Sequence, residues 1–330
     1  MRKLTLRAWL LVVLLAVSFS PLTGTARAPQ GTPQASFDKG QSLATQTLAE
    51  QQAPDGVALL ADRPPLGIVI AEGDSWFAYP GLDVIGALKG QTLPNRDYYK
   101  VYSAANPGDT VESMAYDQAQ REDFADEFRK VVDARGQADV KAVLLSGGGN
   151  DIAGKEFHML LNHAQSSIGT PVDAAVADAF IDRIGRSLES LIGSAVTFAD
   201  QILGRPKVRI LVHGYANPVP DGRGFWIGWP FPGPWLEPGF LSKGYPNVDA
   251  AALRRNTDVM ADLIARFNKR VAQIPARLQG RADVRYVDLT KVLGNTLGNN
   301  AYRSDWSNEL HPTNDAFRRV AAELHRAIQQ

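Results

Sequence analysis

Four short segments of the sequence carry side chains that could act together in acyl transfer. GDS at residues 73–75 offers the hydroxyl of Ser75, and the others are NPGD at 106–109, GGND at 148–151 and NELHP at 308–312. A serine hydroxyl is a poor nucleophile unless a general base lies within hydrogen-bonding distance. Aspartate and serine are also common helix N-caps, so GDS alone fits either a nucleophile or a cap. The decision depends on whether a base can reach Ser75.

His311 is the candidate base among the five histidines. It lies in a loop directly before a predicted terminal helix, and Pro312 fits a helix start. On position alone, His311 could also be an ordinary loop residue. His213 ends a predicted strand, where it could be a buried core residue, and the remaining three are expected in helices or a loop.

Gly108 and Asn150 are candidates to stabilise the negative charge that develops on a carbonyl oxygen during acyl transfer. Such a site needs hydrogen-bond donors aimed at that oxygen. Gly108 has no Cβ, so its backbone N–H can approach a substrate closely. Asn150 follows a run of glycines and offers a side-chain amide. The ordinary alternatives are a turn glycine and an asparagine that bonds its own turn.

The elements that must position these residues alternate between short apolar runs and longer helical stretches. The predicted strands cover residues 66–71, 99–105, 140–148, 208–214 and 284–289. The predicted helices cover residues 122–134, 172–203, 248–274 and 314–329. Continuous apolar strands separated by helices indicate a parallel sheet covered on both faces, here a single doubly wound α/β domain over residues 66–330. Ligands in such folds bind beyond the carboxyl ends of the strands, which is where the four segments fall.

In this order and context, the four segments resemble the nucleophile, glycine, asparagine and histidine blocks of the SGNH, or GDSL, hydrolase family. The resemblance covers roughly residues 66–317. It implies a flavodoxin-like three-layer α/β/α sandwich with a five-stranded parallel sheet. It also implies ester hydrolysis through an acyl-enzyme on Ser75, with His311 as the base and without a metal or cofactor. The oxyanion hole would then consist of the N–H groups of Ser75 and Gly108 and the amide of Asn150.

One position departs from the family pattern, because the last block is usually D-x-x-H and this chain has Asn308 three residues before His311. The acid holds the imidazole tautomer and stabilises imidazolium, and in serine proteases its replacement by asparagine costs about 10⁴ in rate. Glu309 or Asp305 could supply the carboxylate instead. A Ser–His dyad oriented by Asn308 or a backbone carbonyl could suffice. The third alternative is an enzyme that is slow or inactive.

An aromatic segment at residues 225–240 follows the fourth predicted strand and holds Trp226, Trp229 and Trp235, three of the six tryptophans. Its prolines and glycines prevent a regular helix. A loop of this length in a compact domain is usually functional, so it is expected to form a wall of an acyl or sugar pocket. The alternatives are a self-packed loop and a contact with a membrane surface.

The N-terminus has the order of a secretory signal peptide over residues 1–28, with cationic residues, a short apolar core and small residues. Cleavage is expected after Ala26 or Ala28, and an uncleaved anchor is the alternative. Residues 29–65 are rich in Gln, Ala, Pro and Thr and predict a disordered spacer. The protein is therefore expected to be exported, to the periplasm or the outside of the cell, with no stable membrane span after cleavage.

Composition excludes several classes of function. The chain has 330 residues, 35 Lys and Arg against 35 Asp and Glu, and no cysteine. Cysteine chemistry is therefore excluded, and nucleic acid is not an expected partner. A small-molecule, lipid or glycan ester is the expected substrate. An O-acetyl esterase or acyltransferase acting on a surface glycan, or a non-catalytic binding module, would fit the same scaffold. A metal-dependent phosphatase or sulfatase fits poorly, since the spacing of His and Asp residues shows no ligand cluster.

Overall fold

The computed structural model describes residues 38–39, 41, 64–90, 92–153, 156–225 and 233–330. The predicted signal peptide and most of the predicted spacer lie outside these residues. Within them, Asp38 of the spacer forms an ion pair with Arg281 at 2.5 Å. No helix in the described ranges combines the length and the hydropathy needed to cross a membrane.

The core of the fold is a five-stranded parallel sheet with the order β2-β1-β3-β4-β5. Its strands are β1 (Ile68–Glu72), β2 (Lys100–Ser103), β3 (Val140–Leu145), β4 (Arg209–His213) and β5 (Asp283–Val287). Every residue of β1 is buried, and the apolar run from Ile68 to Ala71 is what a strand needs when helices cover both faces of a sheet. All five predicted strands overlap observed ones, and the predicted α/β class with a five-stranded parallel sheet is confirmed.

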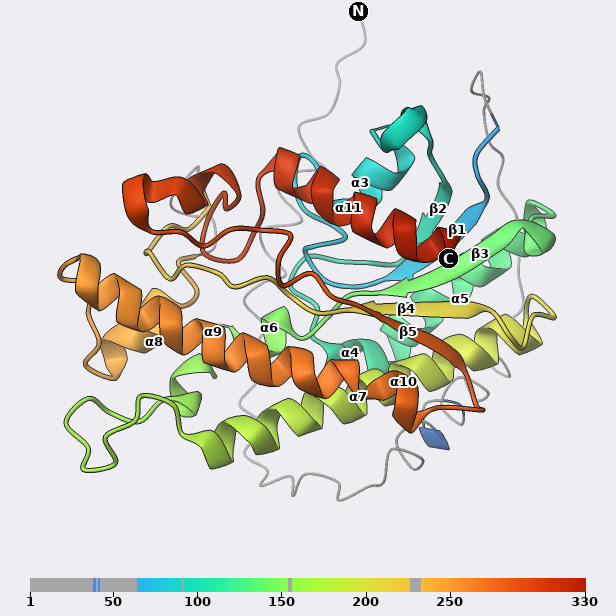
Figure 1. Ribbon diagram of the computed structural model, residues 1–330. Coiled ribbons are helices and arrows are strands. Elements are labelled where there is room, and N and C mark those ends of the chain that lie inside the picture. Colours follow the sequence, from blue (N-terminus) through green and yellow to red (C-terminus); the bar gives the residue numbers. More distant parts are fainter. Residues whose placement is uncertain (1–37, 40, 42–63, 91, 154–155, 226–232) are drawn as a thin grey trace, which may run out of the picture. The chain divides into compact units, whose positions relative to one another are not determined.

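Helices cover both faces of the sheet (Figure 1). One face carries α3 (Val84–Lys89) and α11 (Asn314–Gln329). The other carries α4 (Val111–Tyr116), α5 (Gln118–Asp133), α7 (Ala174–Gln201), α9 (Ala250–Ala272) and α10 (Ile274–Arg277). Shorter pieces at the loops are α6 (Gly149–Ile152), α8 (Glu237–Ser242), η2 (Pro94–Arg96), η3 (Gln137–Asp139), η4 (Phe157–Leu160) and η5 (Gly298–Ser304).

Capping side chains explain where the long helices begin. The Oδ1 atoms of Asp173 and Asp249 accept backbone N–H groups in the first turns of α7 and α9, and Thr313 Oγ1 does so for α11. The start of α11 matches the prediction. Helix α5 begins at Gln118 rather than at residue 122, because Asp117 caps it through Gln120 N–H (3.1 Å).

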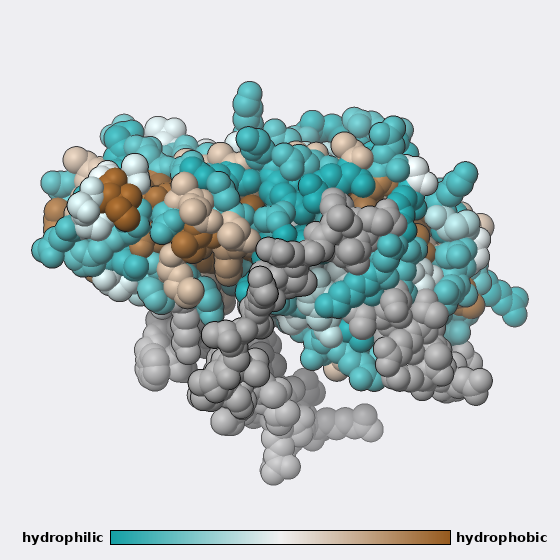
Figure 2. Space-filling model, turned by 90° about the horizontal axis from the view of Figure 1, so that it is seen from below, coloured by the Kyte–Doolittle hydropathy of each residue, from teal (hydrophilic) through white to brown (hydrophobic). Residues whose placement is uncertain are grey.

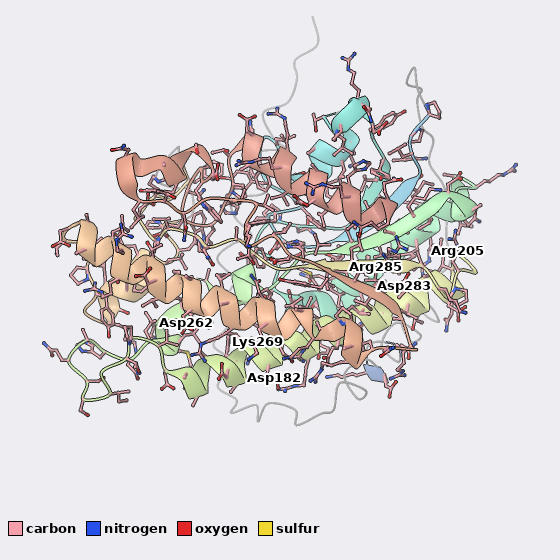
Figure 3. All side chains as sticks on the ribbon, viewed as in Figure 1. Asp182, Arg205, Asp262, Lys269, Asp283 and Arg285 are labelled. Atoms are coloured by element: carbon pink, nitrogen blue, oxygen red, sulfur yellow. The ribbon has the colours of Figure 1, made fainter. Side chains whose placement is uncertain are left out.

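Ion pairs fasten α7 to α9. Arg270 on α9 reaches both Asp182 and Glu189 on α7, at 2.9 Å each, and Arg266 reaches Asp178 at 2.8 Å. Figure 3 labels Asp182 and Asp262 at this pair of helices. Glu189 is fully buried and Arg270 nearly so, and removal of either partner would leave an uncompensated buried charge. Helix α9 is therefore held firmly beside the carboxyl ends of the strands.

Most of the surface seen in Figure 2 is hydrophilic, with apolar atoms gathered toward the end of the molecule that carries α8. Exposed apolar side chains of this region are Met159, Ile168, Leu241 and Val248. They lie in or near η4, α8 and the loops that follow them.

Candidate active site

Ser75 lies in the turn that follows β1, at the carboxyl edge of the sheet, and is 8% exposed. The next helix, α3, begins at Val84 and is capped by Asp83, whose Oδ1 accepts Gly86 N–H (2.6 Å). The alternative that Ser75 is a helix N-cap is therefore wrong. Its side chain contacts His311 instead.

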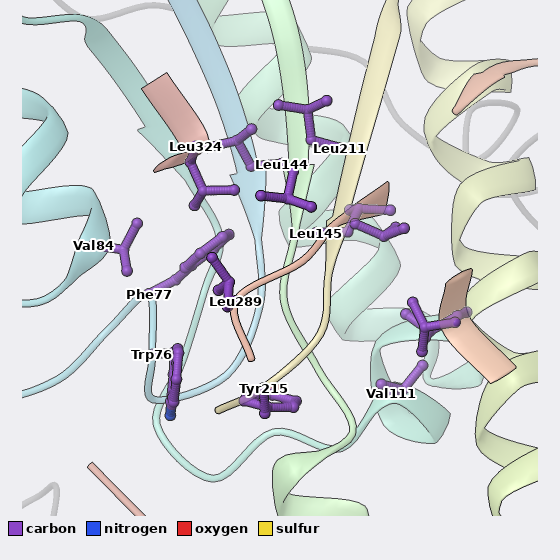
Figure 4. Close-up of a cluster of buried hydrophobic side chains, with 14 of the residues drawn as sticks. Trp76, Phe77, Val84, Val111, Leu144, Leu145, Leu211, Tyr215, Leu289 and Leu324 are labelled. Atoms are coloured by element: carbon purple, nitrogen blue, oxygen red, sulfur yellow. The ribbon is translucent and has the colours of Figure 1, made fainter. Parts of the chain in front are cut away.

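Asp74 fixes this turn. Its Oδ1 accepts Trp76 N–H (3.0 Å) and the Ser146 hydroxyl (2.8 Å), and its Oδ2 accepts the Tyr215 hydroxyl (2.6 Å). A buried carboxylate needs such donors. The donors come from the turn itself and from the residues that follow β3 and β4, so Asp74 joins three strand ends. The rings of Trp76 and Tyr215 also meet edge to face, with centroids 4.9 Å apart (Figure 4).

His311 bridges Ser75 and Asn308. Its Nε2 lies 2.8 Å from Ser75 Oγ, and its Nδ1 lies 3.0 Å from Asn308 Oδ1. Asn308 Oδ1 also accepts the backbone N–H groups of Leu310 (3.0 Å) and His311 (2.9 Å). Because backbone N–H groups only donate, the atom facing them is the amide oxygen, which only accepts. Nδ1 of His311 is therefore protonated, and Nε2 carries the lone pair that accepts the proton of the Ser75 hydroxyl.

Aromatic rings surround this imidazole. The ring of Tyr79 stacks on His311 with centroids 4.2 Å apart and an interplanar angle of 22°. The ring of Trp235 meets the same imidazole at 5.3 Å and 68°. The Tyr79 hydroxyl also accepts a hydrogen bond from Asn308 Nδ2 (3.1 Å), so both ends of the Asn308 amide are fixed.

Burial lowers the pKa of His311 to about 3. The imidazole is 6% exposed, and removal from water disfavours its charged form. His311 is therefore neutral near pH 7, as a base must be. Burial therefore makes the imidazolium that forms during catalysis less stable. The group that faces Nδ1 is a neutral amide, which brings no negative charge to stabilise it.

Neither alternative carboxylate reaches the imidazole. Glu309 is fully buried, and its two oxygens accept the backbone N–H groups of Gly222 (3.0 Å), Trp235 (2.7 Å), Leu236 (2.8 Å) and Glu237 (3.1 Å). Asp305 binds Gly294 N–H and Arg319, at 2.5 Å each. The suggestion that Glu309 or Asp305 replaces the missing acid is therefore wrong, because both carboxylates bind groups elsewhere.

Two of the predicted oxyanion donors lie outside the Ser75 turn, Gly108 in the loop after β2 and Asn150 in the short helix α6 after β3. Gly108 has a left-handed φ of 92°, and a Cβ added there would meet no atom within 4 Å, so the space beside it is open. Among the described residues, none accepts the N–H of Ser75 or Gly108. Asn150 Nδ2 donates to Asp109 O (2.9 Å), which uses one of its two amide hydrogens. Asn106 N–H donates to Gly73 O (3.0 Å) and joins the glycine loop to the turn.

The aromatic segment is described in part. Trp226 and Trp229 lie outside the described residues. Trp235 is half-buried against His311, and Leu236 is fully buried beside a cavity next to Ser75. The C-terminal part of the segment therefore lies at the site, as its position after β4 predicted.

Across the described residues, no group of three or more His, Asp or Glu side chains is placed to hold a metal ion.

Two comparisons with known proteins found nothing: no protein-family profile matches the chain, and no curated protein matches it. Structural neighbours of this chain include GDSL-like lipases and acetylxylan esterases. A lipase from a goat rumen metagenome is 11% identical, with 79% of this chain and 96% of that chain covered and a TM-score of 0.43. A GDSL-like lipase from Parabacteroides merdae is 13% identical, with 80% of this chain and 96% of that chain covered and a TM-score of 0.41. A variant of an acetylxylan esterase from Geobacillus stearothermophilus is 13% identical, with 81% of this chain and 96% of that chain covered and a TM-score of 0.37. Similarity this distant transfers no activity, so the function must be argued from the site itself.

The sequence did not identify Tyr79, Ser146 and Tyr215 as members of the site. Ser146 directly follows β3 and Tyr215 lies two residues after β4, so the rule that polar residues after strands face the site could have found them. Tyr79 lies in an irregular segment without a periodic pattern, and no local signal marks it.

Proposed function

We propose that this protein hydrolyses carboxylic esters through an acyl-enzyme on Ser75. The observation that supports the proposal most is the hydrogen-bonded chain from Ser75 Oγ through His311 to Asn308, in which Nε2 is the acceptor. A nucleophile, a base and a group that orients the base are the parts that covalent catalysis requires. The open donors of Ser75, Gly108 and Asn150 supply the fourth part, an oxyanion site.

In the first half-reaction, Ser75 Oγ bonds to the ester carbonyl carbon while its proton moves to His311 Nε2. The electron pair of the carbonyl double bond moves to oxygen, which accepts hydrogen bonds from the N–H groups of Ser75 and Gly108 and from Asn150. As the carbonyl re-forms, the alkoxide leaves and takes the proton from Nε2. Water repeats these steps on the acyl-enzyme and releases the acid.

Two groups compensate in part for the missing carboxylate in this mechanism. The carbonyl of Asn308 holds the tautomer, which is one of the two tasks of the acid. The face of the Tyr79 ring lies against the imidazole and attracts the positive charge that forms there. We expect a working but slow catalyst.

Labelling with a fluorophosphonate tests the proposal, because the probe modifies only an activated serine. Wild type and the control Ser167→Ala, which changes an exposed serine, should be labelled, and Ser75→Ala should not. His311→Ala should lose both labelling and hydrolysis of p-nitrophenyl acetate. Labelling that persists in Ser75→Ala would refute the assigned nucleophile, and unlabelled but folded wild type would favour a binding module.

We also propose that the protein is exported, on the basis of the signal-like order of residues 1–28. N-terminal sequencing of the mature protein should find a start at Arg27 or Pro29. A mature protein that keeps Met1 would instead support an uncleaved anchor or a protein that is not exported.

A further inference from the structure

A small cavity of about 40 Å³ lies beside Ser75. Ser75 and Asn150 line it together with the apolar side chains of Ile152, Leu236, Met260 and Ile264. The cavity therefore touches the proposed nucleophile and one oxyanion donor.

The position of the cavity indicates which half of an ester it receives. Once the carbonyl oxygen lies at the oxyanion donors, the leaving alcohol must face His311 Nε2, which protonates it. His311 does not line the cavity, whereas Ser75 and Asn150 do. The acyl chain is the part that extends from the carbonyl carbon away from the base, so the cavity fits the acyl chain.

We propose that this cavity is the acyl pocket and restricts the substrates to short acyl groups, from acetyl to butyryl. The inference rests on the proposed esterase function. A group of about the size of water needs at least roughly 10–15 Å³ of cavity volume. The volume of about 40 Å³ therefore holds on the order of three methyl-sized groups. The carbonyl carbon stays at Ser75, which leaves room for about three carbons beyond it.

The walls are buried, so a longer acyl chain would have to displace packed side chains. Leu236 and Met260 are at most 1% exposed, and Ile152 and Ile264 are 3% and 6% exposed. Met260 and Ile264 lie on adjacent turns of the same face of α9. Ion pairs from Arg270 and Arg266 link that helix to α7. A longer acyl chain that displaced the helix would have to break these ion pairs.

The lining also selects against charged acyl groups. Among the described residues that line the cavity, Asp74 is the only ionisable carboxylate, and its oxygens already accept three hydrogen bonds. A second carboxylate, as in a succinyl group, would lose its hydration without gaining a cationic partner. A neutral alkyl chain loses no such hydration.

A series of p-nitrophenyl esters tests the limit, because the leaving group stays constant while the acyl chain grows. In wild type, kcat/KM should fall by about 30-fold or more from butyrate to octanoate. Ile264→Ala should enlarge the pocket and raise the octanoate-to-acetate ratio about 10-fold. Ala153→Val, which adds volume to a lining residue, should lower the butyrate-to-acetate ratio by a similar factor.

Leu263→Ala is the matched control, because Leu263 is a buried neighbour on the same helix that does not line the cavity. It should leave the acyl-length profile unchanged, and melting curves identify any variant that fails to fold. Equal rates for acetate and octanoate in wild type would overturn the acyl-pocket proposal while keeping the esterase. Absence of both ester hydrolysis and fluorophosphonate labelling would instead overturn the proposed function.

Discussion

Asn308 orients the imidazole of His311, whereas Glu309, the next residue, binds four backbone N–H groups of the segment from Gly222 to Glu237. Both residues are almost completely buried. The neutral amide thus occupies the position at which the SGNH pattern, which the sequence resembles, has a charged residue. The carboxylate occupies a place where its charge satisfies the backbone of a loop.

The difference teaches that a carboxylate close to the base in sequence need not act on the base. Burial raises the pKa of Glu309 to about 7, despite the four N–H groups that favour its charged form. What these bonds stabilise is the position of Trp235 and Leu236, which touch the imidazole and the acyl cavity. Asn308 therefore controls the orientation of the base, and Glu309 controls the wall around it.

Asn308→Leu should have the largest effect. Leucine has a similar volume but cannot accept the Nδ1 proton, so His311 can adopt the wrong tautomer, and kcat should fall about 10³-fold or more with KM nearly unchanged. Steady-state kinetics with p-nitrophenyl acetate measure this. Asn314→Leu, at an exposed asparagine just beyond His311, should retain wild-type kcat. A loss under 10-fold in Asn308→Leu would mean that the amide does not orient the base.

Asn308→Asp should have the next largest effect, in the opposite direction. The new charge stabilises imidazolium, and the Tyr79 hydroxyl can reverse its role and donate to the carboxylate. We expect kcat near pH 8 to rise by about 10- to 100-fold, less than the roughly 10⁴ that the reverse change costs in serine proteases.

The pH profile of Asn308→Asp provides its control. His311 must be neutral to act, so activity is lost as the pH falls through its pKa. With that pKa at about 3, wild type should keep its rate to about pH 4. The charge in the variant raises the pKa of His311, so its activity should fall at a higher pH. An unchanged acid limb would show that residue 308 does not influence the imidazole.

The fold and the polar members of the site could be predicted because each leaves a local signal. The first strand is continuously apolar from Ile68 to Ala71. Ser75 and Gly108 each follow a strand in a turn that contains a glycine, and Asn150 lies in α6 directly after the glycines that follow β3. Parallel strands bring their carboxyl ends to one edge, so order in the sequence becomes proximity in space.

Distances between side chains on separate loops could not be predicted. Asn308, Glu309 and Asp305 all lay within reach of His311 by sequence separation, and only the path of the loop decides which one meets Nδ1. The contact between Tyr79 and His311 spans most of the domain in sequence and has no periodic pattern behind it. The size of the acyl cavity depends on residues from α6, α9 and the segment before α8, which no single motif contains.

Glu309→Gln should lower kcat/KM by about 10-fold, mainly through KM, because the wall around the substrate shifts rather than the base. In glutamine, an NH₂ group replaces one of the two carboxylate oxygens. Two of the four backbone N–H groups therefore lose their hydrogen-bond acceptor. Hydrolysis of p-nitrophenyl butyrate should show the effect. A larger loss in kcat than in Asn308→Leu would reverse the roles assigned to the two residues.

The stability of Glu309→Gln provides a second measurement. The folded pKa of Glu309 is raised to about 7 from 4.5, so the folded protein binds the extra proton between these values. The contribution of Glu309 to the free energy of unfolding of wild type is therefore fully present below pH 4.5 and is lost as the pH rises to 7. Urea unfolding should show the advantage of wild type over the variant growing by about 1.4 kcal/mol per unit as the pH falls from 7 to 4.5. If the free energies of unfolding of wild type and variant change in parallel with pH, the pKa of Glu309 is not raised.

Tyr79→Phe should have the smallest effect, because two backbone N–H groups still hold the Asn308 oxygen after the hydroxyl is lost. We expect kcat to fall about 3-fold, which corresponds to a hydrogen bond worth about 0.7 kcal/mol. Tyr79→Leu also removes the ring face from His311 and should cost a further 3- to 10-fold, as expected for a cation–π contact with imidazolium. Tyr102→Phe on the edge strand β2 is the control and should leave kcat unchanged. If the Phe and Leu variants are equally active, the ring does not stabilise the charge on His311, and the Asn308 carbonyl alone compensates for the missing acid.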